Sequence, residues 1–85
     1  MFQIEGREVL FGWLEKEHDT QRRLGVLEWL TEFSDDPLKD AWRVPGIRAP
    51  VFIVKIPVLP APVLMKFLYV DQYRVVKIID LGPLP

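Results

Sequence analysis

The apolar pattern of this 85-residue chain changes its period half-way along the sequence. From Arg7 to about Ser34 the apolar residues recur three or four positions apart, which is the spacing of amphipathic helices. After Pro50 they form dense runs of β-branched and aromatic residues with prolines at their ends, which is typical of strands. The sequence therefore predicts an α+β fold, with a helical first half and a sheet in the second half.

The helical half is expected to be a two-helix hairpin preceded by a short N-terminal strand. Phe2 to Ile4 alternate between apolar and polar residues, as a short strand does. The first helix would run from Arg7 to about Glu17, and Asp19 or Thr20 would cap the second one. A single bent helix from Arg7 to Ser34 is the alternative.

The second helix carries more apolar residues than one packing face requires. Its expected inward stripe is Leu24, Leu27, Leu30 and Phe33, and Val26 and Trp29 widen that stripe. The whole chain is 49% hydrophobic, with three Trp and five Phe. So short a chain is expected to leave part of this apolar surface exposed, and exposed apolar patches usually mark partner surfaces.

Three strands are predicted in the second half, at Val51–Ile56, Val63–Val70 and Tyr73–Leu81. The links between them are short, which predicts an antiparallel meander. With the N-terminal strand this makes a four-stranded sheet. The middle run is almost continuously apolar, so we expect a central strand covered on both faces. Leu38 to Trp42 would add one more helical turn, and residues 1–85 are expected to form a single domain.

Composition excludes several classes of site. The chain has no Cys and a single His, which excludes disulfides, thiolate zinc sites and histidine-rich metal sites, so no metal or cofactor is expected. The N-terminus lacks a signal-peptide pattern and the apolar run from Val58 to Met65 is too short to span a bilayer, so a cytoplasmic protein without membrane contact is expected. Ser34, the only serine, lies beside two aspartates at a helix end, and a structural role is expected for it.

The cations of the second half are notable for their placement, because the net charge is only −1. Lys55, Lys66 and Lys77 each interrupt an apolar strand, so some of them would share one open sheet face and bind an RNA phosphate there. The alternative is that such lysines only keep strands from pairing with other molecules. Together with Lys77, the candidate RNA-binding residues are Arg43, Arg48 and Arg74.

The order of elements resembles the RelE/ParE toxin superfamily. The segments that carry the resemblance are DDPLKDAWRVPG after the second helix, then PVFIVKIP, then VLMKFLYVDQYRVVKIIDLGPLP. The resemblance implies a sheet with the helices on one face. It also implies the toxin of a type II toxin–antitoxin pair, bound and covered by a small antitoxin. It also implies a metal-independent endoribonuclease that cuts mRNA on the ribosome and stabilises phosphate charge with Arg and Lys.

On this resemblance Lys55 and Lys66 are the expected catalytic cations, with Arg48 just before the first meander strand. The chain departs from the family pattern at two points. It has no arginine early in the middle meander strand, and it lacks the C-terminal Tyr or His that active members often carry. No residue is identified as the general base.

Three functions remain open. The first is a translation-inhibiting toxin with an antitoxin partner. The second is a non-enzymatic interaction domain of the same fold. The third is a small homodimeric structural domain that buries its apolar loop against a second copy. The expected partner interface, whatever the partner, is Val58, Leu59 and Trp29.

Overall fold

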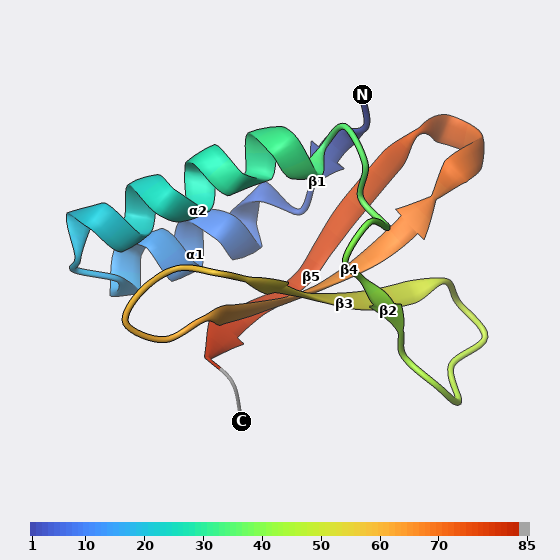
Figure 1. Ribbon diagram of the computed structural model, residues 1–85. Helices are drawn as coiled ribbons and strands as arrows, with labels where there is room; N and C mark the ends of the chain where they lie inside the picture. Colours follow the sequence, from blue (N-terminus) through green and yellow to red (C-terminus); the bar gives the residue numbers. More distant parts are fainter. Residues whose placement is uncertain (84–85) are drawn as a thin grey trace.

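The computed structural model describes residues 1–83 and has two helices beside one sheet (Figure 1). This confirms the predicted α+β class. The helices are α1 (Arg7–Lys16) and α2 (Thr20–Phe33), and a short 3-10 turn, η1, covers Asp71–Tyr73. The strands are β1 (Gln3–Glu5), β2 (Trp42–Arg43), β3 (Val51–Ile56), β4 (Val63–Val70) and β5 (Val75–Pro83).

The strands lie in the order β1-β5-β4-β3-β2. The antiparallel meander β3-β4-β5 is confirmed, and β1 pairs in parallel with β5 at one edge. The sheet has five strands where the sequence predicted four, because β2 adds to the other edge. Trp42 pairs with Ile53 and Arg43 with Phe52, so the helical turn expected up to Trp42 is wrong at its end: the chain turns over residues 37–40 and is then extended.

Two residues set where the helices begin. Gly6 precedes α1 with a φ of 79°, and a Cβ atom there would collide with the backbone carbonyl of Ile78. Asp19 caps α2, because its Oδ1 accepts hydrogen bonds from the backbone N–H groups of Gln21 at 2.9 Å and Arg22 at 3.4 Å. The two-helix hairpin is confirmed, and the single bent helix is wrong.

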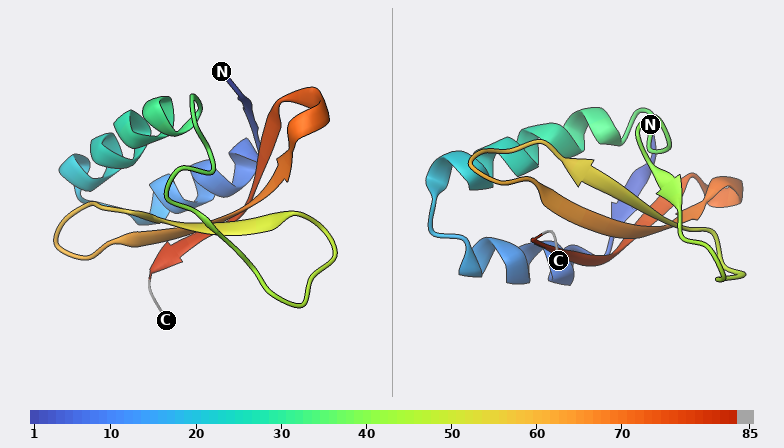
Figure 2. Two further views of the ribbon diagram at one scale, coloured as in Figure 1. Left: turned by 45° about the vertical axis from the view of Figure 1, so that its right-hand side comes forward. Right: turned by 60° about the horizontal axis from the view of Figure 1, so that its bottom comes forward.

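The core lies between the helices and one face of the sheet. Phe67 in β4 is at its centre, with its ring 5.0 Å from that of Phe33 in α2 and 5.9 Å from that of Phe52 in β3. Around these rings the buried residues are Leu10, Val26, Leu30, Val54, Ile56, Val63, Met65, Val76, Ile78 and Leu81. In this layer α1 lies along β5, while α2 packs toward β3 and β4 (Figure 2).

The inward stripe predicted for α2 is only half right. Leu30 and Phe33 are buried, but Leu24 and Leu27 are 48% and 40% exposed. Val26 is fully buried in their place. The physical reason is a close approach at Gly25, where a Cβ would lie only 3.0 Å from Cγ1 of Val58. This contact turns the Gly25 side of the helix toward the β3–β4 loop and leaves the Leu24 side in solvent.

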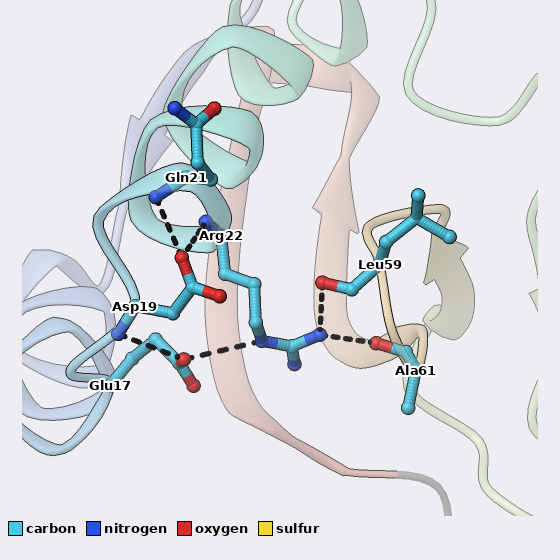
Figure 3. A network of polar contacts seen from close by, with 6 residues as sticks. All are labelled: Glu17, Asp19, Gln21, Arg22, Leu59 and Ala61. Atoms are coloured by element: carbon cyan, nitrogen blue, oxygen red, sulfur yellow. Dashed lines mark hydrogen bonds and ion pairs between the residues drawn. The ribbon is translucent and has the colours of Figure 1, made fainter.

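The β3–β4 loop is held against the helical hairpin by one arginine (Figure 3). Arg22 donates from Nη1 to the carbonyl oxygens of Leu59 at 2.9 Å and Ala61 at 2.6 Å. Its Nε lies 3.3 Å from Oε1 of Glu17. Arg22 therefore connects the turn between the helices to the loop that presents Leu59.

The central strand is covered on one face only, which corrects the expectation of two covered faces. The inward residues of β4, such as Met65 and Phe67, are fully buried, whereas Leu64, Lys66 and Leu68 are only half-buried. No helix among residues 1–83 lies against that second face. No described helix is long and apolar enough to cross a membrane.

Candidate functional site

The uncovered face of the sheet, called the open face below, carries all three strand lysines. Side chains alternate between the two faces of a strand, so residues that pair across strands share a face. Lys55 pairs with Leu64, Lys66 pairs with Ile53, and Lys77 pairs with Leu68. Lys55 and Lys66 are diagonal neighbours on adjacent strands, a separation that long side chains can bridge.

A hollow of about 270 Å³ lies on the open face around Lys66. Ile53 of β3 and Leu64 of β4 are its apolar walls, β4 also contributes a lysine, and β5 contributes one carboxylate. The residues that line it are Ile53, Leu64, Lys66, Asp80, Gly82 and Pro83. It is the place on the open face where a lysine and a carboxylate border the same concave surface.

Acidic residues stand opposite two of the three lysines. Asp80 pairs in register with Lys66, and Glu5 of β1 pairs in register with Lys77. Lys55 has an apolar residue as its β4 partner and is exposed. The positive charge available to an incoming anion is therefore greatest beside Lys55 and is offset at the other two lysines.

The arginines named as RNA-binding candidates lie outside the hollow. Arg43 braces the β2–β3 turn, because its Nη2 donates to the backbone carbonyl of Arg48 at 2.9 Å. Arg74 follows η1 with a φ of 52°, and its guanidinium lies 4.5 Å from the centre of the Phe2 ring. Both contacts are structural, and the structure does not bring these three arginines to the hollow of Lys66.

The residues named as a partner interface differ in their exposure. Leu59 is 83% exposed at the tip of the loop that Arg22 holds. Val58 is half-buried against Gly25, and Trp29 is half-buried with its ring 4.9 Å from that of Phe33. Apolar side chains on the outer surface of the helices add to the exposed set, and the sequence pattern missed them: Phe11, Leu24 and Leu27.

Asp80 lines the hollow but was not predicted from the sequence as a site residue. Its position depends on an irregularity in β5: the register shifts between Lys66 and Phe67 of β4, where Ile78 pairs with Phe67 and Asp80 with Lys66. Ile79 is the extra residue of this β-bulge and is 43% exposed. The only signal in the sequence is that Ile78, Ile79 and Asp80 break the alternation that Val76 begins.

Ser34 has the structural role expected from its place at the helix end. It is buried, its Oγ donates to the carbonyl oxygen of Thr31 at 2.8 Å, and its own carbonyl accepts from the N–H of Phe2 at 2.7 Å. Across residues 1–83, no three His, Asp or Glu side chains are grouped so as to hold a metal ion.

Solved structures with the same arrangement exist from E. coli. The isolated E. coli RelE toxin matches with a TM-score of 0.70 at 17% identity, over 100% of this chain and 86% of RelE. The chain has the RelE fold. A free RelE mutant with two arginines replaced by alanine gives a TM-score of 0.68 at 17% identity, over 96% of this chain and 82% of the mutant.

The likeness to the RelE fold extends over the whole of this chain. In the intact E. coli RelBE toxin–antitoxin complex the match has a TM-score of 0.71 at 17% identity and covers 100% of this chain and 99% of a chain of that complex. No family model and no curated protein matches the sequence.

Proposed function

We propose that this protein is the toxin of a type II toxin–antitoxin pair and inhibits translation by cutting mRNA on the ribosome. The observation that carries the proposal is the combination of a RelE fold that extends over the whole of this chain with a lysine-bearing hollow on its open sheet face. The structures that share the fold are described as a toxin and as a toxin–antitoxin complex. Translation occurs in the cytoplasm, which is where the protein would act.

In this proposal the lysines provide electrostatic catalysis. Lys66 borders the hollow and Lys55 lies diagonally across from it, so a phosphodiester seated there would meet two ammonium groups. Charge that develops on the phosphate oxygens during cleavage is stabilised by such fixed cations. The exposed Arg48 and the paired Lys77 would contribute longer-range attraction for the RNA backbone.

The antitoxin is proposed to cover the exposed apolar side chains. Leu59 lies on a loop that Arg22 already holds in place. The loop would therefore lose little conformational entropy when a partner binds. Phe11, Leu24 and Leu27 leave a further apolar area on the helices. Together they account for the apolar surplus of the composition.

The test is regulated expression in a bacterial host with growth and incorporation of labelled methionine recorded. We expect the parent to stop protein synthesis, and Lys55→Ala combined with Lys66→Ala to restore it. The matched control is Arg23→Ala combined with Lys39→Ala, which removes the same charge from exposed positions away from the open face and should leave toxicity intact. An inert parent, or a Lys55/Lys66 double variant as toxic as the parent, would refute the proposal.

A non-enzymatic interaction domain is the second candidate, and one observation favours it. Asp80 and Glu5 stand opposite two of the three lysines, which lowers the attraction of the open face for RNA. Under this candidate the parent binds a protein partner through its apolar surface without cleaving mRNA. Primer extension on cellular mRNA separates the two, since only the nuclease produces new 5′ ends. The homodimer alternative is tested by sedimentation of the purified protein.

A further inference from the structure

The β-bulge in β5 determines which face of the sheet Asp80 occupies. Ile78 pairs with Phe67 and points into the core. If the strand alternated regularly, Ile79 would pair with Lys66, and Asp80 would pair with Met65 and point into the core as well. The extra residue shifts the register by one, so Asp80 pairs with Lys66 and Leu81 takes the buried position opposite Met65.

The bulge thus places the Asp80 carboxylate on the open face, at the β5 side of the hollow. β-bulges are common beside active sites, where they redirect a side chain. Directly opposed side chains in an antiparallel pair have their Cβ atoms about 5 Å apart, so the Asp80 carboxylate and the Lys66 ammonium border the same hollow from adjacent strands. Lys66 is half-buried between Ile53 and Leu64, whose apolar side chains limit the water around it.

From this geometry we infer that Asp80 is the general base of the proposed RNA cleavage and that Lys66 stabilises the charge on the attacked phosphate. The inference rests on the proposed function. It assigns the one role that the lysines cannot fill while they remain protonated, since an ammonium group has no lone pair to accept a proton.

The reaction balances without a further reagent. The 2′-oxygen of the ribose attacks the adjacent phosphorus while its proton passes to the Asp80 carboxylate. The bond from phosphorus to the 5′-oxygen of the next nucleotide breaks, and that oxygen takes a proton from water. The products are a 2′,3′-cyclic phosphate and a 5′-hydroxyl end. General-base assistance of this kind contributes roughly 100- to 10,000-fold in rate.

The test is single-turnover cleavage of a reporter mRNA on programmed bacterial ribosomes, with Asp80→Asn as the main variant. We expect its rate to fall by at least about 100-fold, and Asp80→Glu, which keeps a carboxylate, to recover part of it. Glu5→Gln is the matched control, because Glu5 stands opposite Lys77 on the same face, outside the hollow. It should cleave at the parent rate, and thermal unfolding should show that all variants are folded.

The pH profile separates a base from a residue that merely supports the fold. The parent rate should fall as the pH is lowered, because a protonated carboxyl group cannot accept the proton of the 2′-hydroxyl, and the residual rate of Asp80→Asn should lack that acid limb. The other charged groups near Asp80 come from β4, from α1 and from the residue that follows α1, and are unchanged in the variant: Lys66, Glu8, Lys16 and Glu17.

The outcomes also separate this inference from the proposed function. If the parent cleaves mRNA and Asp80→Asn cleaves at the same rate or faster, the inference is wrong while the proposed function stands; faster cleavage would identify Asp80 as a counter-ion that competes with the phosphate. If the parent does not cleave mRNA at all, both are overturned. A folded Asp80→Asn variant that loses activity together with the acid limb supports the assignment.

Discussion

Replacing Arg22 with Met removes the contacts that connect the helical hairpin to the β3–β4 loop. Met keeps most of the aliphatic stem but has no donor, so the carbonyl oxygens of Leu59 and Ala61 lose the guanidinium (Figure 3). The contact with Glu17 at 3.3 Å is lost as well. The side chain of Arg22 is 14% exposed, so water replaces these contacts poorly on the arginine's side.

The size of the effect follows from the type of contact. A hydrogen bond to a charged group contributes about 1.5–3 kcal/mol to stability. The two acceptors lie on an exposed loop and regain water, so the lower value applies to each, and the part-exposed ion pair adds about 0–1 kcal/mol. We expect Arg22→Met to lower the free energy of unfolding by about 3–4 kcal/mol, equivalent to about 12–32 °C in Tm for a domain of this size.

The measurement is urea unfolding followed by circular dichroism, with Arg23→Met as the matched control. Arg23 is the next residue in α2, is exposed, and has no side-chain hydrogen bond or ion pair among residues 1–83. The control should unfold like the parent. If Arg22→Met and Arg23→Met have the same free energy of unfolding, Arg22 does not hold the loop and the reasoning fails.

Two further changes test the backbone and the aromatic cluster. Gly6→Ala should destabilise the fold by more than the roughly 1–2 kcal/mol that a left-handed conformation costs, because the new Cβ would also collide with the Ile78 carbonyl. Gly12→Ala has open space around it and should raise stability by about 1 kcal/mol. Thermal unfolding compares the two variants, and equal effects would contradict this reasoning. Burial and the hydrogen bond to Asp71 raise the pKa of Tyr69, so the unfolded chain releases this proton first above about pH 10 and stability falls as the pH rises there. Tyr69→Phe should show a smaller alkaline loss in urea unfolding, and an identical loss would argue against this contribution.

The parts of the fold with a strong local signal were predictable from the sequence. β3 and β4 have the predicted bounds, because dense runs of β-branched residues favour strands and the prolines beside them mark the strand ends. The cap at Asp19 was likewise one of two expected residues. β2 was not predicted, because two residues are too few to show an alternating pattern. It is a strand only through its pairing with β3.

The site was less predictable, because it depends on register and on contacts between distant residues. The three lysines were identified as a set, but the acidic partners of Lys66 and Lys77 come from pairing that no local pattern reveals. The position of Asp80 depends on which of two adjacent isoleucines becomes the extra residue, and both are equally apolar. The sequence predicts Arg74 as an RNA contact, whereas its guanidinium lies over the ring of Phe2, which is 72 positions away in the chain.

The parallel pairing of β1 with β5 has a consequence for how the protein is made. Gln3 pairs with Val75, so the first strand to leave the ribosome finds its neighbour only after every other described strand has been synthesised. The helical hairpin and the β3–β4 hairpin form from local contacts and need no such delay. Until β5 has been synthesised, the core that buries Phe2 is incomplete and the Ile78 carbonyl that packs against Gly6 is absent. The edge of the sheet at β1 therefore closes last, and between the synthesis of β4 and that of β5 the growing chain exposes an unpaired edge of β4.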